Sequence, residues 1–161
     1  MLFQLLIAVH YQLGKKRDEH WLTTTRDGLS PFFRLIEGIM DYEDDKLIRQ
    51  IIWQINEDFS LSVNEIWTQS FQNKKCQTSL FYVLLDAFYH QLSDDATTST
   101  FLCELIASIH AQMGEPKKQL WLQPSTFPKG KTLTPFYILL IAFFSKPNRK
   151  KLLQLLHDVH L

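Results

Sequence analysis

The chain contains only two cysteines, Cys76 and Cys103. Their separation matches neither a zinc-binding pattern nor the cysteine framework of a small disulfide-rich domain. Thiols that stay reduced are typical of proteins inside cells. The cysteine content therefore predicts a cytoplasmic protein.

Long apolar stretches are also missing. The longest uninterrupted apolar run, residues 136–144, has nine residues, whereas a helix that spans a bilayer needs about 20. The first residues, MLFQLLIAVHYQLGKKR, are apolar as well, but their positive charges follow the apolar part, and a signal peptide carries them in front. We therefore expect neither a signal peptide nor contact with a membrane.

Neither sign of charge is in excess, because 17 Lys and Arg residues balance 17 Asp and Glu residues. Proteins that bind nucleic acid depend on surplus positive charge, so a nucleic-acid partner is not expected. Hydrophobic residues make up 45% of the 161 residues, which is typical of a folded protein with a substantial core. We predict a single domain over residues 1–161, and the alternative that it is part of a longer protein stays open.

Recognised catalytic motifs are absent: the sequence has no phosphate-binding loop, nucleophile elbow, zinc-protease motif or dinucleotide fingerprint. Cys103 falls in a predicted helix at a position that apolar residues occupy elsewhere, and Cys76 has no histidine close to it in sequence. Acidic clusters at 41–45 and 94–95 precede predicted helices, where negative charge complements the helix dipole. We therefore predict a protein that is not an enzyme and has no cofactor, no metal and no catalytic residues.

What the sequence does contain is one helical pattern that occurs four times. LFQLLIAVHYQLG (2–14) resembles LCELIASIHAQMG (102–114) at an offset of 100 residues. In the first copy, apolar residues recur at the spacing of one helix face, as Leu2, Leu5, Leu6 and Val9. We call the four predicted segments, 2–13, 47–59, 101–113 and 150–161, the B helices. Gly14 and Gly114 follow two of them at the position that favours a left-handed residue.

A second pattern, DGLSPFFRLI in its first copy, begins three further helices. We call these predicted segments, 31–41, 79–92 and 135–145, the A helices. Each follows a hydroxyl residue that can cap the first turn, namely Ser30, Thr78 and Thr134. The sequence therefore predicts an all-α fold with seven main helices. These form about three and a half helix pairs, with repeats at about 30–59, 78–113 and 134–161 after the first B helix.

The segment Asp27-Gly28-Leu29-Ser30-Pro31-Phe32-Phe33 resembles D-G-x-T-P-L-H, the start of an ankyrin repeat, and Thr134-Pro135 keeps its T-P pair. An ankyrin repeat has about 33 residues, whereas Val9, Ile55, Ile109 and Val159 lie 46, 54 and 50 residues apart. The resemblance implies an ankyrin-like solenoid that binds a protein partner. Enlarged repeats of this kind also resemble effectors that intracellular bacteria deliver into host cells, which would place the protein in the host cytoplasm.

Two series of residues recur with the repeats. His10, His110 and His160 occupy one position of the B helices, with Asn56 in the fourth. Stacked helices lie about 8–10 Å apart, too far for these histidines to share one zinc ion, so we expect them to satisfy carbonyl groups at the ends of the B helices. Trp21, Trp67 and Trp121 lie in the B-to-A connections. They either pack under these connections or form an exposed aromatic strip, and burial distinguishes the two.

The ankyrin resemblance places the binding surface on the B-to-A connections. The candidate contacts there are Trp21, Arg26, Trp67, Lys74, Lys75, Trp121, Lys129 and Lys131. An acidic partner segment that binds the late connections is one hypothesis, and a solvated edge is the alternative. Because Phe3, Ile7 and Tyr11 make the first B helix apolar on more than one side, we expect either self-association there or a chain that is one segment of a longer repeat protein. A helical domain of an effector enzyme and a structural or dimerisation segment remain the alternatives to a binding module.

Overall fold

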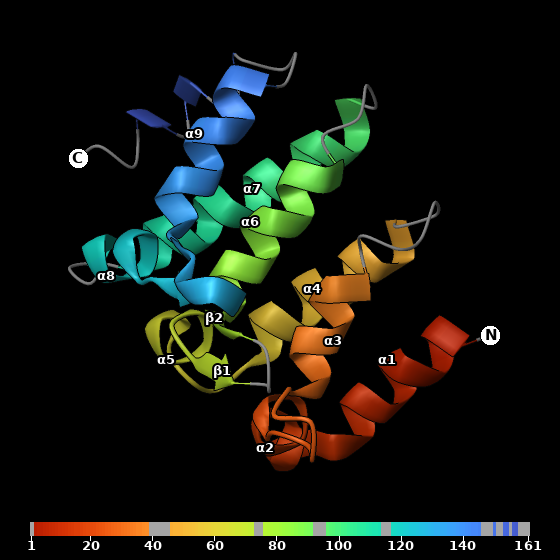
Figure 1. Ribbon diagram of the computed structural model, residues 1–161. Helices are drawn as coiled ribbons and strands as arrows, with labels where there is room; N and C mark the ends of the chain where they lie inside the picture. The colour runs from red at the N-terminus through yellow and green to blue at the C-terminus, as the bar shows by residue number, and fades with distance from the viewer. Residues whose placement is uncertain are drawn as a thin grey trace.

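The computed structural model describes residues 2–38, 46–72, 76–91, 96–113, 117–145, 150, 153–154 and 156–157. This part of the chain is mostly helical (Figure 1). The long helices are α1 (Leu2–Leu13), α3 (Pro31–Gly38), α4 (Lys46–Asp58), α6 (Leu80–Gln91), α7 (Ala96–Gln112) and α9 (Pro135–Ser145). They match six of the seven predicted segments, although α7 begins five residues before the predicted start at 101. The predicted segment 150–161 and Gly114 lie largely or wholly outside the described residues.

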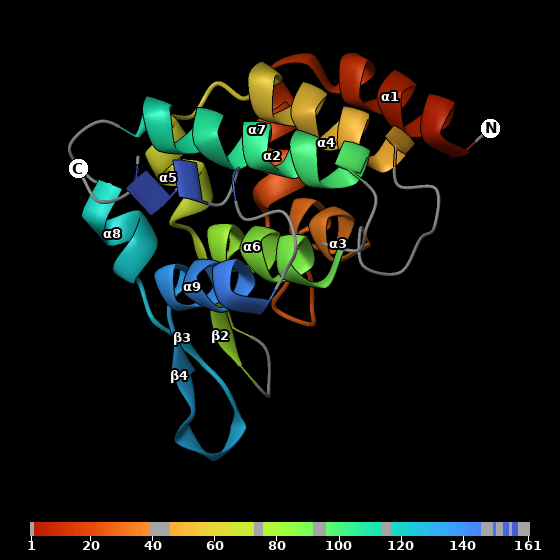
Figure 2. The same cartoon turned by 90° about the horizontal axis from the view of Figure 1, so that it is seen from above.

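The long helices lie in two layers (Figure 2). The B helices α1, α4 and α7 contact one another in chain order, and so do the A helices α3, α6 and α9. In addition, α3 packs on α4 and α6 packs on α7, so these A helices contact the B helix that follows them. An apolar stripe on a helix must be buried against another element, and the contacts of α3 with α4 and of α6 with α7 bury such stripes between the two layers.

Three short helices follow the B helices and were not predicted. They are α2 (Arg17–Leu22), α5 (Val63–Trp67) and α8 (Lys117–Leu122), and the 3-10 turn η1 (Gly14–Lys16) precedes the first of them. Gly14 has φ 51, the left-handed conformation expected at the end of the first B helix. At α5, Ser62 accepts a hydrogen bond from the N–H of Glu65, and the Glu65 side chain reaches back to the N–H of Ser62. This capping box explains why α5 begins there.

The A helices begin with the predicted caps at two of three positions. Ser30 accepts a hydrogen bond from the N–H of Phe33 at 3.1 Å, and Thr134 accepts one from the N–H of Tyr137 at 3.3 Å. In α6, however, Ser79 is the cap, not Thr78, because the Ser79 hydroxyl accepts from the N–H of Tyr82 at 3.2 Å. The predicted alignment of α6 with the other A helices was therefore one residue out.

The main departure from the predicted all-α class is a small antiparallel sheet. Its strands are β1 (Ser70–Gln72), β2 (Gln77–Ser79), β3 (Ser125–Thr126) and β4 (Thr132–Leu133), paired in that order. β1 with β2 and β3 with β4 form hairpins in the second and third B-to-A connections, and the 3-10 turn η2 (Pro128–Gly130) closes the second hairpin. β2 also pairs with β3 through Gln77 and Thr126, which joins the two connections. We call these four strands the loop sheet.

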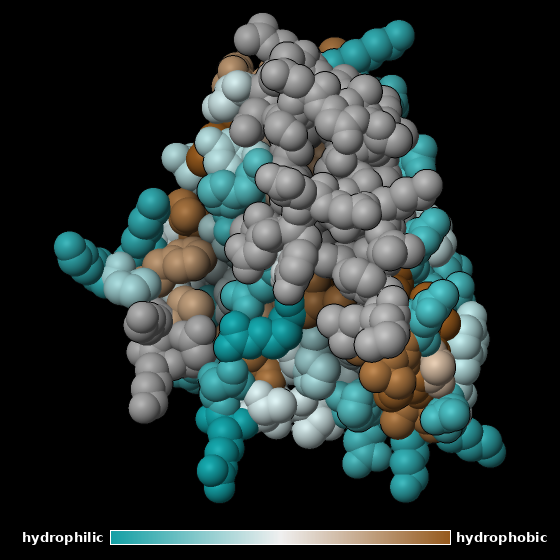
Figure 3. Space-filling view, turned by 90° about the vertical axis from the view of Figure 1, so that its right-hand side faces the viewer, coloured by the Kyte–Doolittle hydropathy of each residue, from teal (hydrophilic) through white to brown (hydrophobic). Residues whose placement is uncertain are grey.

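Burial of the B helices differs at the N-terminal end. Leu5 was predicted to lie in the buried stripe of α1, but 59% of it is exposed, whereas its counterparts Ile51 and Leu105 are 2% and 0% exposed. α4 and α7 each pack on an A helix, whereas α1 packs on α4 and on the short helix α2. Figure 3 views the molecule from the side on which α1 begins in Figure 1, and hydrophobic residues gather at the lower right of this view.

Candidate functional site

The B-to-A connections are tied to one another by a recurring contact. Gln69 and Gln123 each lie two residues after a tryptophan. The Gln69 amide donates to the carbonyl of Leu22 in the preceding connection at 3.4 Å. The Gln123 amide likewise donates to the carbonyl of Thr68 at 3.0 Å, and to the hydroxyl of Ser70 at 2.8 Å. Together with the pairing of β2 and β3, these contacts make one surface from three separate connections.

The exposed cations predicted to bind a partner lie in two places on these connections. Lys129 and Lys131 are exposed at the closed end of the β3–β4 hairpin, which projects from the layer of A helices (Figure 2). Lys129 has φ 66 and Gly130 has φ 70, so the chain turns sharply between these lysines. Arg26 is exposed in the first connection. Lys74 and Lys75, in the second connection, lie outside the described residues.

The first connection is a compact turn built around Asp27. The Asp27 carboxylate accepts hydrogen bonds from the Thr25 hydroxyl, from the Arg34 guanidinium at 2.6 Å and from the N–H of Leu29 at 3.3 Å. These contacts lower the pKa of Asp27 to about 2. Gly28 has φ 80 in the same turn, a conformation that glycine adopts without strain. The acidic residue beside Arg26 is thus already paired with Arg34.

The three tryptophans of the connections do not form an exposed strip. Trp21, Trp67 and Trp121 are 4%, 0% and 3% exposed, so their rings cannot contact a partner. All three are therefore removed from the candidate contacts. The side chains of His10, Asn56 and His110 pair with these indoles, a contact that was not predicted, and His160 lies outside the described residues. Each indole N–H donates to a side chain eleven residues earlier, namely His10 Nδ1 at 3.1 Å, Asn56 Oδ1 at 2.9 Å and His110 Nδ1 at 3.0 Å.

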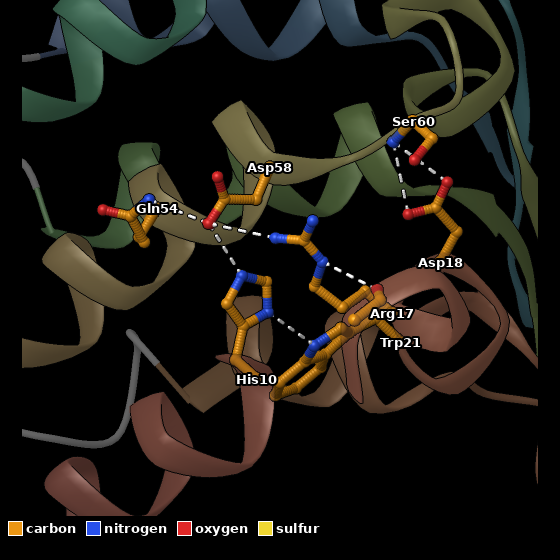
Figure 4. Close-up of polar contacts among 8 residues, drawn as sticks. His10, Arg17, Asp18, Trp21, Gln54, Asp58 and Ser60 are labelled. Carbon is orange, nitrogen blue, oxygen red and sulfur yellow. Dashed lines mark hydrogen bonds and ion pairs between the residues drawn. The ribbon is translucent and has the colours of Figure 1, made fainter. Parts of the chain in front are cut away.

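His10 is held from both sides (Figure 4). Its Nδ1 accepts the indole N–H of Trp21, and its Nε2 lies 2.9 Å from Asp58 Oδ2. Because Nδ1 is an acceptor, the neutral ring carries its proton on Nε2 and donates it to Asp58. Neither ring nitrogen is left to take a proton from a substrate, so this histidine and aspartate are not arranged as a general base.

Asp58 connects α4 to the N-terminal segment. It accepts a hydrogen bond from the Gln54 amide at 2.9 Å and lies 3.4 Å from the Arg17 guanidinium. Burial raises the pKa of Asp58, but the hydrogen bonds from Gln54 and His10 and the charge of Arg17 outweigh this, and the pKa lies below its ordinary value. Figure 4 shows these side chains converging between α1, α2 and α4. Their role is to join the elements of the fold.

No family model, no curated protein and no solved structure matches the chain.

A hollow of about 560 Å³ crosses the layer of B helices and was not predicted. Trp53, which lies outside the tryptophan series, is half-buried in it. Glu104 is the one titratable acid among the residues that line the hollow, which are Ile7, Tyr11, Gln50, Trp53, Gln54 and Glu104. The signal for this feature was present in the sequence, because Trp53 lies between Gln50 and Gln54 on the polar side of its helix.

Other classes of site find little support in the described part of the chain. Among its residues, no three His, Cys, Asp or Glu side chains come together to hold a metal ion. Cys76 and Cys103 are partly buried thiols. None of the helices in the described ranges is long and apolar enough to cross a membrane.

Proposed function

We propose that the protein is a non-catalytic interaction module, an ankyrin-like solenoid of stacked helix pairs, that binds a protein partner on the loop sheet and the first B-to-A connection. The observation that carries this proposal is the pairing of β2 with β3 through Gln77 and Thr126. It joins the connections of successive helix pairs into a continuous surface. Side chains held on such a surface lose less freedom on binding than side chains on separate loops.

Recurring contacts support the stacked arrangement. The hydrogen bonds from tryptophan to a residue eleven positions earlier occur after α1, α4 and α7. The contacts of Gln69 and Gln123 each reach the residue that follows the preceding tryptophan. Because equivalent residues make equivalent contacts in successive units, each unit packs on the next in a similar way, as in repeat proteins.

The chemistry of the partner follows from the exposed cations. Lys129, Lys131 and Arg26 are exposed, and neither lysine forms an ion pair with a carboxylate of the described residues. The chain as a whole has no net charge, so any electrostatic preference comes from such local groups. An acidic segment of a partner is therefore the chemistry that this surface favours.

Charge reversal tests the acidic-partner proposal. With a fluorescein-labelled peptide of ten glutamates as probe, Lys129→Glu combined with Lys131→Glu should weaken binding about 10-fold at low salt, equivalent to about 1.4 kcal/mol. Fluorescence anisotropy measures the change. The control is Lys150→Glu, which reverses the charge of an exposed lysine outside the loop sheet and the first B-to-A connection, and it is compared with Lys129→Glu and Lys131→Glu made singly, which change the net charge equally. If Lys150→Glu weakens binding as much as these single variants, or if the wild type does not bind, the proposed surface is wrong.

Self-association at the N-terminal end remains a second proposal, favoured by the exposure of Leu5 (59%) and Tyr11 (57%) on α1. Sedimentation velocity should show a fraction of dimer that increases with protein concentration, because association would remove these side chains from water. Leu5→Lys should shift the equilibrium to monomer. The control Leu153→Lys changes a similarly exposed leucine, 57% exposed, near the opposite end. A wild type that stays monomeric at high concentration would contradict this proposal.

A further inference from the structure

Each of the first two A helices packs an aromatic residue against the connection of the next unit. The Phe33 ring on α3 lies 5.3 Å from the Phe71 ring of β1. The Tyr82 ring on α6 lies 5.4 Å from the ring of Phe127, which directly follows β3. As a result, only 2% of Phe33 and 4% of Tyr82 are exposed. Covering of this position by an aromatic from the following unit is thus a regular feature of the fold.

The third A helix presents the same position uncovered. Tyr137 follows its cap, Thr134, by three residues, as Tyr82 follows Ser79. Yet 49% of Tyr137 is exposed, and no aromatic ring within the described ranges packs on it. Phe144, one further residue of α9, is 71% exposed. The free side of α9 therefore retains the apolar character that α3 and α6 use to bind the following unit.

The loop sheet ends at the same place. β4 pairs with β3 on one side, and in the described residues its other edge is unpaired. Its counterpart in the preceding connection, β2, pairs on both sides. Thr132 in β4 precedes Tyr137 by five residues, as Gln77 in β2 precedes Tyr82. Gln77 pairs with Thr126, and the next residue, Phe127, covers Tyr82. The edge of β4 and the ring of Tyr137 therefore have the same spacing in sequence as β2 and Tyr82, which β3 and Phe127 occupy.

We propose that the free edge of β4 and the side chain of Tyr137 form a docking site for an extended segment of the protein partner. The segment adds an antiparallel strand to the loop sheet beside Thr132, and the residue after the one that pairs with Thr132 is aromatic and lies on Tyr137. Backbone hydrogen bonds give affinity and the aromatic residue gives specificity, as in other cases of strand addition. This inference rests on the proposed function, because it names a partner feature for the same loop sheet.

The chain supplies its own probe for this site. The peptide acetyl-LQPSTFP-amide copies residues 122–128, the segment that pairs with β2 and covers Tyr82. It has no charge, so its binding does not depend on the lysines of the acidic-partner proposal. A single short strand with one ring contact binds weakly, with a Kd on the order of millimolar, and titration followed by two-dimensional NMR of the full chain detects this range.

The titration should move the amide signals of Thr132 and Leu133 and the signals of Tyr137. Replacing phenylalanine by alanine in the peptide should weaken binding about 2- to 10-fold, and Tyr137→Ala in the protein should weaken it by a similar factor. The control Tyr11→Ala removes a similarly exposed tyrosine (57%) on α1 and should leave peptide binding unchanged.

Other outcomes would overturn this inference. Signals that move elsewhere, or equal binding of the alanine peptide, would show that β4 and Tyr137 do not recognise an aromatic strand. Signals of Tyr137 that depend on protein concentration alone would show that a second copy occupies the site. The double variant Lys129→Glu and Lys131→Glu should bind this uncharged peptide normally. Loss of acidic-peptide binding and loss of strand binding are therefore separate results, and either can fail alone.

Discussion

Replacing Trp67 by alanine should lower the free energy of unfolding by about 3–5 kcal/mol. The side chain is 0% exposed, its ring lies 5.7 Å from the ring of Phe32, and its N–H lies 2.9 Å from Asn56 Oδ1. The substitution leaves a cavity, ends the ring contact and leaves a buried acceptor on Asn56 without its donor. Urea unfolding followed by far-ultraviolet circular dichroism measures the loss without relying on tryptophan fluorescence.

The matched control is Trp53→Ala, which removes the same kind of side chain from the hollow on the B helices. Trp53 is half-buried, and its alanine variant should lose about half as much stability or less, because less area is returned to water. Folded domains are stable by about 5–15 kcal/mol, so the Trp67 variant would lose a large share of the total. Equal losses in the two variants, or a loss below about 1 kcal/mol at Trp67, would contradict this account of the core.

The long helices could be predicted from the sequence because their signals are local. The predicted B helix at 2–13 is α1 to the residue, and the predicted A helix at 135–145 is α9. A hydroxyl cap marks the start of each A helix, and the apolar spacing within each helix needs no knowledge of distant residues. The prediction was a residue out at α6, because both Thr78 and Ser79 can cap. Thr78 instead lies in β2, where its hydroxyl is 2.9 Å from that of Ser125.

The loop sheet could not be predicted in the same way. Its strands have two or three residues, too few to show an alternating pattern. The pairing of Gln77 with Thr126 joins residues that only the stacking of helices brings together. The exposure of Leu5 could not be predicted for a similar reason, since Leu5 occupies a position of the apolar stripe that is normally buried. Whether such a residue is buried depends on the element opposite, and a helix pattern does not carry that information.

The candidate site was predicted in part. Arg26, Lys129 and Lys131 are exposed on the connections, as a partner-binding role requires. The tryptophans were misplaced in that set, although a signal in the sequence could have shown their role. Each tryptophan lies eleven residues after His10, Asn56 or His110. A constant spacing between a hydrogen-bond donor and an acceptor indicates that the same hydrogen bond recurs in each unit. Tyr137 was missed, because only its exposure distinguishes it from Tyr82.

Replacing Asn56 by leucine should lower the free energy of unfolding by about 1–3 kcal/mol, because the buried N–H of Trp67 then loses its acceptor. Asn56→His should cost clearly less. At the same position of α1 and α7, a histidine Nδ1 accepts the indole N–H at 3.1 Å and 3.0 Å. The chain thus shows that either side chain can do this, and leucine, which is close to asparagine in size, removes the acceptor without a large cavity.

The comparison of the two variants tests the stacked units themselves. In urea unfolding, the free energy of unfolding of Asn56→His should lie between those of wild type and Asn56→Leu, and nearer to that of wild type.

The introduced ring also needs a partner for Nε2, which at His10 is Asp58. Equivalent positions of the second and third B helices lie 54 residues apart, so Gln112 is the counterpart of Asp58. The amide nitrogen of Gln112 donates to Ser108, and its amide oxygen would accept the Nε2–H of the introduced histidine. If histidine and leucine cost the same, position 56 is not equivalent to positions 10 and 110. The eleven-residue spacing would then reflect packing alone, and the support that it gives to repeating units would be lost.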